Sequence, residues 1–169
     1  MKLSTKGRYA VTALADIALH GGTPEDGEGA RVSLSEIAER QDISLAYLEQ
    51  LFARLRRAGL VESVRGPGGG YRLARPAAEM RISDVMAAVD ERLNAMGCGG
   101  DPERPCSGSQ AQCLTHDLWE QLSAHVHVFL SRTTLADVVA SRMVPCPAVP
   151  DFTALPEDGP APARAARVQ

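Results

Sequence analysis

Residues 33–73, SLSEIAERQDISLAYLEQLFARLRRAGLVESVRGPGGGYRL, carry the signals for two helices and a β-hairpin in immediate succession. Ser33 and Glu36 have the spacing of a capping box, which predicts the start of a short helix that ends near Gln41. A tight turn follows at 42–44, and its last residue, a serine, is the expected N-cap of the next helix. Two helices joined by so short a turn predict a helix-turn-helix.

The second helix is expected from Leu45 to Ala58, because apolar residues recur on one face and Gly59 supplies a stop. Two short strands follow at 60–64 and 71–73, joined by the glycine-rich turn 65–70. Helix, turn, helix and hairpin in this order are the layout of a winged helix-turn-helix. We therefore expect a mostly α-helical fold with a β-hairpin as its wing. The apolar face consists of Leu48, Leu51, Phe52 and Leu55.

The sequence on either side of this unit adds helices and polar loops. An amphipathic helix is expected from Arg8 to His20, followed by a polar loop at 23–30. After the hairpin, Ser83 is the expected cap of a helix that runs through Val89, and residues 96–112 read as a loop rich in Gly, Pro, Ser and Cys.

A long helix is expected from Cys113 to Ser131, and Thr134 begins a last short helix with a capping-box pattern. The apolar stripe of the long helix is wider than so small a chain can bury in itself. Packing on the chain's own core is one explanation. We favour dimerisation, because a single helix-turn-helix contacts too few base pairs for useful specificity. The stripe consists of Leu118, Leu122, Val126 (or His125) and Phe129.

These elements divide the chain into three parts. Residues 1–75 form the expected DNA-binding domain, and residues 76–142 hold the cysteine loop and the dimerisation helices. Residues 143–169 form a proline-rich tail with little apolar pattern, which we expect to be disordered. Cys146 lies in this tail and is expected to be a bystander.

The composition is that of a globular protein, with 44% hydrophobic and 23% charged residues among 169. No apolar run reaches the roughly 18 residues that span a bilayer. The first residues lack the apolar core of a signal peptide, so we expect the cytoplasm as compartment and no membrane as partner. Four cysteines in a cytoplasmic chain favour metal binding or redox sensing over a disulfide framework.

The net charge of −3 hides a local excess of positive charge. Residues 54–75 contain six arginines and one acid, which is the electrostatic footprint of a nucleic-acid-binding surface. In isolation, a solvated helix face is the favoured explanation of the arginines. With the helix-turn-helix before them and the wing after them, double-stranded DNA becomes the favoured partner.

The helix that starts after Ser44 is the candidate recognition helix. Its Glu49 and Gln50 can bond to base edges in the major groove, since Gln pairs with adenine and Glu accepts from cytosine. Glu49 has a simpler explanation as the ion-pair partner of Arg54. In the wing, Arg65 could enter a narrow minor groove. The candidate DNA-binding residues are Ser44, Ala46, Tyr47, Glu49, Gln50, Arg54, Arg56, Arg65 and Gly66, with Arg57 as a further phosphate ligand.

The glycine-rich turn has two alternative explanations, an ordinary hairpin connection and a nucleotide-binding loop. The nucleotide loop is excluded by spacing, because Gly66, Gly68 and Gly70 are followed by Tyr71 and do not give G-x-G-x-x-G.

Three cysteines and a histidine follow one another in the pattern C-x7-C-x6-C-x2-H. Cys113 and His116 have the i, i+3 spacing that puts them on one face at the start of a helix, where thiolates are favoured. The loop before them can bring Cys98 and Cys106 to the same face. Three thiolates and one imidazole suit tetrahedral zinc or a 2Fe–2S cluster. Three reduced surface cysteines remain the simplest alternative.

An enzyme is disfavoured, because no paired carboxylates or nucleophile–base set accompanies this group. Four protein ligands also leave no open coordination position for a substrate.

Several motifs together resemble the iron–sulfur cluster assembly regulators, a family of winged-helix transcription factors. They are KGRYAVTA at 6–13, ISLAYLEQLF at 43–52, VRGPGGGY at 64–71, AVDE at 88–91 and CLTH at 113–116. The likeness extends from residue 1 to about 142. The cysteine loop is longer than is usual in that family. Arg8 stands where the nitric-oxide-sensing relatives carry an acidic residue, which disfavours nitric-oxide sensing.

The resemblance implies a homodimer with one 2Fe–2S cluster per subunit, held by Cys98, Cys106, Cys113 and His116. It implies a regulator that represses or activates iron–sulfur assembly genes according to cluster occupancy, with the assembly machinery as cluster donor. It also implies that Glu49 takes part in the choice of DNA site and that Arg65 is the wing arginine. A zinc-stabilised regulator that senses nothing is the alternative.

Overall fold

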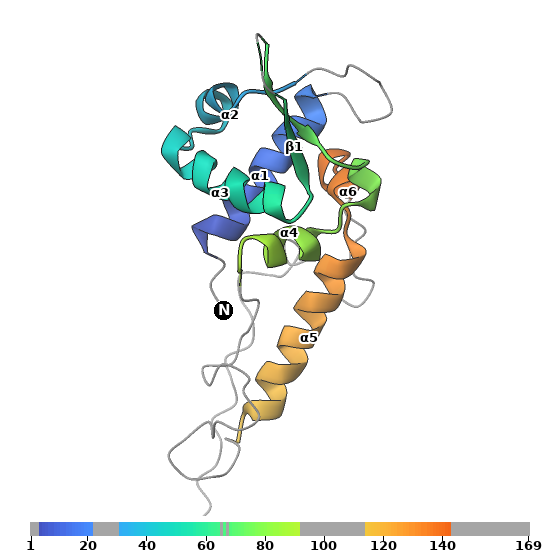
Figure 1. Ribbon diagram of the computed structural model, residues 1–169. Helices are drawn as coiled ribbons and strands as arrows, with labels where there is room; N and C mark the ends of the chain where they lie inside the picture. Colours follow the sequence, from blue (N-terminus) through green and yellow to red (C-terminus); the bar gives the residue numbers. More distant parts are fainter. Residues whose placement is uncertain (1–3, 22–30, 65, 67, 92–113, 143–169) are drawn as a thin grey trace, which may run out of the picture.

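The computed structural model describes residues 4–21, 31–64, 66, 68–91 and 114–142. Figure 1 shows helices gathered around one centre, with a two-stranded wing at one end and a long helix that runs away from the body at the other. In chain order the elements are α1 (Thr5–His20), α2 (Leu34–Gln41), α3 (Leu45–Arg57), β1 (Val61–Val64), β2 (Gly70–Leu73), the 3-10 helix η2 (Ala77–Glu79), α4 (Ile82–Ala88), α5 (His116–Arg132) and α6 (Leu135–Val139).

The predicted helix-turn-helix is confirmed, and local capping defines its helices. The Ser33 hydroxyl accepts from the Glu36 amide at 3.2 Å, and the Glu36 carboxylate accepts from the Ser33 amide at 2.7 Å. Ser44 caps α3 by accepting from the amide of Tyr47 at 3.3 Å. The helix ends before Gly59, whose φ of 70° lies in the left-handed region. The capping box predicted at Thr134, with Asp137, is also present.

Three helix starts differ from the prediction, one of them that of α5, which begins at His116 rather than Cys113. The helix α1 begins at Thr5 rather than Arg8, because Ser4 caps it by accepting from the amide of Lys6 at 3.2 Å. The prediction that Ser83 caps the next helix is wrong, since α4 begins at Ile82 and has no side-chain cap. The Ile82 amide donates to the carbonyl of Thr133 at 2.9 Å instead, so a tertiary contact satisfies this helix end.

The wing is an antiparallel hairpin in which Val61 is paired with Leu73 and Val64 with Gly70. A single bridge between Val32 and Tyr71 ties the segment before α2 to the outer edge of β2. Gly70 is required there, because a Cβ atom at this position would lie 2.7 Å from the carbonyl oxygen of Val32. The wing is thereby fixed to the helix-turn-helix.

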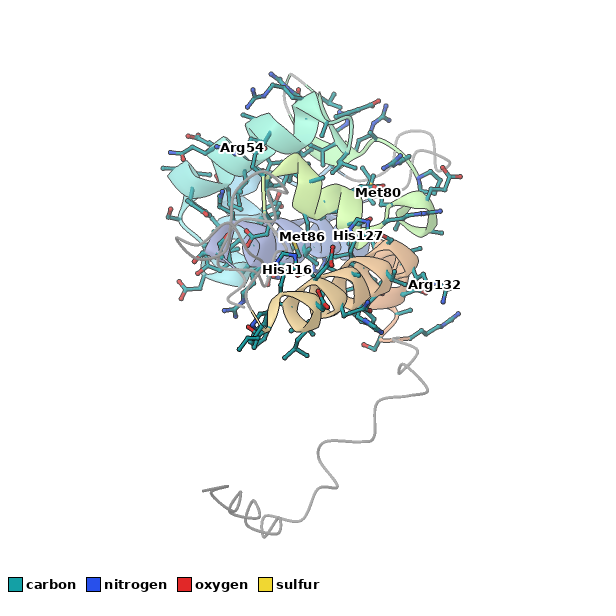
Figure 2. The ribbon with its side chains drawn as sticks, turned by 90° about the horizontal axis from the view of Figure 1, so that it is seen from below. Arg54, Met80, Met86, His116, His127 and Arg132 are labelled. Carbon is teal, nitrogen blue, oxygen red and sulfur yellow. The ribbon has the colours of Figure 1, made fainter. Side chains whose placement is uncertain are left out.

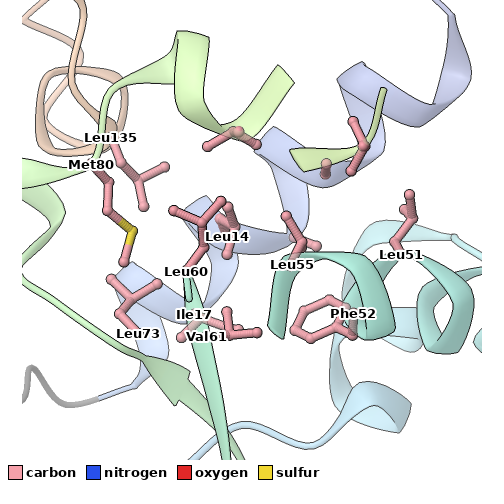
Figure 3. Packing of buried hydrophobic residues seen from close by; sticks show 14 of the residues in the cluster. Leu14, Ile17, Leu51, Phe52, Leu55, Leu60, Val61, Leu73, Met80 and Leu135 are labelled. Carbon is pink, nitrogen blue, oxygen red and sulfur yellow. The ribbon is translucent and has the colours of Figure 1, made fainter. Parts of the chain in front are cut away.

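One apolar core joins the helix-turn-helix to the later helices (Figure 3). Phe52 of α3 is fully buried and meets the ring of Tyr71 edge to face at 4.7 Å. Met80, just before α4, and Leu135 of α6 are also fully buried. The core therefore packs against the inner face of the recognition helix α3 and leaves its outer face free of core contacts. Its fully buried large side chains are Phe52, Leu14, Ile17, Ile37, Leu48, Leu55, Leu60, Leu73, Met80, Leu135, Val61 and Val85.

Several predicted segments lie outside the described residues: the loop 23–30, the cysteine loop up to Cys113, and the tail 143–169. Within the described part of the chain, no helix is both long and apolar enough to cross a membrane.

Candidate nucleic-acid interface and cysteine–histidine site

The outer face of α3 is open to solvent while its inner face is buried. Ser44, Ala46, Glu49 and Gln50 are exposed, as the sequence predicted for a recognition helix. Tyr47 is half-buried, because its ring packs edge to face on Tyr9 of α1 at a centroid distance of 5.8 Å. The aromatic pair therefore fixes the base-reading end of α3 against α1. The residues that can meet base edges are the three exposed ones of the first turns, Ala46, Glu49 and Gln50.

The arginines of α3 differ in their surroundings. Arg54 Nη1 bonds to the Asp90 carboxylate at 2.6 Å, so Arg54 does not pair with Glu49. Arg56 Nη1 lies 3.4 Å from the hydroxyl of Ser63, and Arg57 Nε donates to the carbonyl of Ala53 at 3.2 Å. Among the described residues neither Arg56 nor Arg57 is paired with a carboxylate, and both are exposed. Their charge is available to phosphate.

At the tip of the wing Arg65 lies outside the described residues, whereas Gly66 is described and exposed. Gly66 has a φ of 116°, which only glycine adopts readily, and its carbonyl accepts from the amide of Gly69 at 2.8 Å. A Cβ atom on Gly69 would lie 2.5 Å from the carbonyl oxygen of Val64. Gly66, Gly68, Gly69 and Gly70 carry no side chains, so the backbone at these positions can approach a phosphate closely.

A buried ion pair that the sequence analysis missed fastens α1 to α2. The side chain of Asp16 is completely buried and accepts from Arg40 Nη2 at 2.6 Å and from the side-chain amide of Gln41 at 2.7 Å. Burial alone would raise the pKa of the Asp16 carboxyl, but these hydrogen bonds and the Arg40 charge outweigh it and lower that pKa. An acid on the apolar face of α1, beside Ala13 and Ile17, was the signal in the sequence.

The cysteine–histidine group is described only in part. His116 is half-buried and is the first residue of α5, after the N-cap Thr115. Cys98, Cys106 and Cys113 lie outside the described residues. Among the described residues no three His, Cys, Asp or Glu side chains gather closely enough to hold a metal ion. Figure 2 shows Arg54 on α3 and His116 on α5, so the two candidate sites belong to separate elements. The ligand set remains a prediction.

The apolar stripe of α5 is open to solvent, and no residue of this helix is buried in the chain. Leu118 is 61% exposed, Leu122 40% and Phe129 42%, and the adjacent Trp119 is 40% exposed. Side chains of this size seldom gather on a free surface. Among the described residues, the core of the chain therefore leaves much of Leu118, Leu122 and Phe129 uncovered, and dimerisation through this stripe stays a prediction.

The helix-turn-helix, the wing and the exposed outer face of α3 together define a winged-helix DNA-binding protein. Residues 3–141 match the Rrf2 family, described as an iron-dependent transcriptional regulator, and the chain belongs to this family.

Among its relatives, the transcriptional regulator IscR of Cereibacter sphaeroides is 58% identical over 159 residues, covering 94% of this chain and all of the relative. The structure of T. potens IscR has a TM-score of 0.64 at 38% identity, covering 84% of this chain and 88% of that one. CymR, the global cysteine regulator of B. subtilis, has a TM-score of 0.67 at 30% identity, covering 83% of this chain and 98% of that one.

These likenesses confirm the predicted winged-helix fold and the predicted function in transcription regulation. They also agree with the family resemblance that the sequence motifs suggested. A regulator of this family acts by binding DNA, which is the partner that the exposed face of α3 favours.

Proposed function

We propose that this chain is a homodimeric transcription regulator that senses iron–sulfur cluster supply through a 2Fe–2S cluster and controls iron–sulfur assembly genes. The observation that carries the proposal is the position of His116, the first residue of a helix whose apolar face is uncovered. Such a position lets a bound group act on the helix that joins two subunits. The assembly machinery would donate the cluster, and the cytoplasm is the proposed compartment.

In the proposed DNA complex, α3 lies in the major groove and the wing approaches the neighbouring backbone. Glu49 and Gln50 face the bases, while Arg56 and Arg57 neutralise phosphates. Arg65 at the wing tip would enter the minor groove. Residues 1–75 supply this surface, and residues 76–142 supply the cluster site and the dimer contact.

The donor set fits a 2Fe–2S cluster chemically. Cys98, Cys106 and Cys113 offer three thiolates and His116 one imidazole, and iron–sulfur clusters accept both ligand types. When bound, such a cluster supplies a redox-active, acid-labile group.

The exposed stripe of α5 is the proposed dimer contact. Leu118, Leu122 and Phe129 are already partly covered, so burying what is left of them against a second copy would contribute less per side chain than the roughly 1.5–3 kcal/mol of a fully exposed one. Two recognition helices then contact two half-sites about 34–36 Å apart. This arrangement supplies the specificity that one subunit lacks.

The experiment is an ultraviolet–visible spectrum of protein purified without air, with assays of iron and acid-labile sulfide. We expect visible charge-transfer bands and nearly equal iron and sulfide. Cys106→Ala should remove both, while the matched control Cys146→Ala, in the tail, should keep them. A colourless protein that contains zinc would contradict cluster sensing and establish the zinc-stabilised alternative. A full cluster in Cys106→Ala would contradict the ligand assignment.

DNA binding is tested separately on a duplex enriched from a random pool by the wild-type protein. Arg65→Ala should weaken binding at moderate salt, because it removes the proposed wing contact. Glu49→Ala should change which sequences are enriched more than it changes overall affinity, since it removes a base contact. Unchanged affinity in the first variant and unchanged sequence preference in the second would contradict these roles.

A further inference from the structure

The turn at the end of α4 has an unusual residue at its most constrained position. The amide of Asp90 donates to the carbonyl of Ala87 at 3.1 Å, and the amide of Glu91 donates to the carbonyl of Met86 at 2.9 Å. These two bonds are those of a Schellman motif, in which glycine is the usual residue at the left-handed position. Here that residue is Asp90, with a φ of 54°.

Asp is unfavourable at this position for two reasons. A side chain in the left-handed region costs backbone energy that glycine avoids. A negative charge at a helix C-terminus also opposes the helix dipole. The Asp90 carboxylate nevertheless makes a contact with another helix. Its partner is Arg54 in the last turns of α3, at 2.6 Å.

Glu91, the next residue, contacts the start of α1. The Glu91 carboxylate accepts from the amide of Ser4 at 2.9 Å and also from the Ser4 hydroxyl, so it caps the N-terminus of α1. Gly7 makes room for it, since a Cβ atom there would lie 3.1 Å from Cγ of Glu91 and 2.8 Å from Sδ of Met86. In Figure 1 the end of α4 lies beside the start of α1. The adjacent carboxylates of Asp90 and Glu91 thus bind α3 and α1, respectively.

The same turn leads directly into the cysteine segment, because Cys98 follows Glu91 by seven positions. Arg54 lies near the C-terminal end of α3, whereas Glu49 and Gln50 lie nearer its N-terminal end. A helix of 13 residues is about 20 Å long, and it moves as a rigid rod on its packed core. A displacement at Arg54 therefore changes the angle at which the base-reading end enters the groove.

We propose that Asp90 is a positioning residue that fixes the recognition helix α3 through Arg54, and that the Asp90–Glu91 turn carries the state of the cysteine segment to that helix. This inference rests on the proposed cluster function. Asp90 itself binds neither DNA nor the cluster.

The test compares Asp90→Asn with the wild type, each with and without its cluster. Asn tolerates the left-handed region as Asp does, so only the charge is lost. The cluster is removed anaerobically with a chelator, and binding is measured by fluorescence anisotropy on the enriched duplex. Coupling of regulatory size makes the wild-type ratio of the two dissociation constants at least about fivefold. We expect the ratio to fall below about twofold in Asp90→Asn, with unchanged iron and sulfide content.

Glu62→Gln is the matched control, because it removes the acid from another exposed Arg–carboxylate pair, Arg72–Glu62 at 2.8 Å, far along the chain from the cysteines. It should keep the wild-type ratio. A full ratio in Asp90→Asn overturns the inference. Loss of the cluster from this variant also overturns it, since Asp90 would then serve cluster retention. A wild-type ratio of one refutes the proposed cluster sensing, and with it the transmission through this turn.

The positioning of Arg54 is tested without any cluster. In the cluster-free protein, Asp90→Asn and Arg54→Gln should affect DNA affinity non-additively in the double variant, because both break the same contact. Additive effects would contradict the contact. Asp90→Gly removes the charge but keeps a residue that adopts the left-handed backbone without strain. If Asp90 only served the turn, this variant would be at least as stable to heat as the wild type and would keep the wild-type ratio of dissociation constants. We expect the stability to be kept and the regulation to be lost.

Discussion

Replacing Asp16 by Asn should destabilise the helix-turn-helix by breaking the ion pair that fastens α1 to α2. The Asp16 carboxylate accepts from Arg40 Nε at 3.2 and 3.1 Å, from Arg40 Nη2 at 2.6 Å and from Gln41 at 2.7 Å. The NH2 group of the asparagine would face an N–H group of Arg40 or Gln41, so two donors would meet without an acceptor. The negative charge that pairs with the Arg40 guanidinium would also be lost.

The magnitude follows from burial. Removing one partner of a buried pair costs about 3–5 kcal/mol. The Asp16 side chain is 0% exposed but that of Arg40 is 32% exposed, so water can still reach the guanidinium. We therefore expect a loss of about 2–3 kcal/mol in the free energy of unfolding, less than for a fully buried pair. At this chain length that is a fall in melting temperature of roughly 5–10 °C.

Urea denaturation followed by circular dichroism measures the loss, with Glu62→Gln as control. The Glu62–Arg72 pair is partly exposed on both sides, and such pairs contribute less than about 1 kcal/mol. The pH dependence adds a second test. The pKa of Asp16 is lowered in the folded protein, so its stabilisation is present above the unfolded pKa of about 3.9 and disappears as pH falls through the folded pKa.

The difference between wild type and Asp16→Asn should therefore be largest near neutral pH and shrink in acid. A variant that loses no more stability than Glu62→Gln would refute the reasoning. So would a difference that is constant down to the acid unfolding transition.

Three further predictions concern the DNA surface and the dimer. Arg57→Gln should weaken binding to all duplexes alike and reduce the slope of log affinity against log salt by about 0.9, since one phosphate contact is lost. A loss confined to certain sequences would contradict a phosphate role. Gly69→Ala should lower DNA affinity by on the order of 1–2 kcal/mol through distortion of the wing turn, with an unchanged helical circular dichroism signal; full affinity would show that the turn accommodates a side chain. Leu122→Asp should give a monomer in light scattering after size exclusion, whereas Gln121→Asp, an exposed neighbour off the apolar stripe, should remain a dimer; a dimer in the first variant would place the interface elsewhere.

The sequence predicted those features of the fold that depend on neighbouring residues. The two capping boxes join residues only three positions apart, Ser33 with Glu36 and Thr134 with Asp137. Such short spacing can be recognised in the sequence itself. The recognition helix and hairpin followed from periodicity and glycine. The prediction failed at Ser83, because the burial of Ile82 and its bond to a distant carbonyl moved the helix start. Tertiary contacts of this kind have no local signal.

The polar pairs that orient the helices could not be predicted for the same reason. Asp16 and Arg40 are 24 positions apart, Arg54 and Asp90 are 36 apart, and Ser4 and Glu91 are 87 apart. Asp16 differs from its neighbours as an acid on an apolar helix face, but neither it nor Asp90 and Glu91 indicated which distant residue would be its partner.

These three pairs have a common consequence for DNA recognition. Apolar packing around Phe52 sets where α3 lies and limits its crossing angle, but the hydrophobic attraction itself is less directional than a hydrogen bond. Hydrogen bonds to a carboxylate are directional, and all three pairs join ends or flanks of the helices that surround the core. Losing an exposed pair such as Arg54–Asp90 costs little stability. The angle of a recognition helix can therefore change while the fold persists, which is the property that a DNA-binding switch requires.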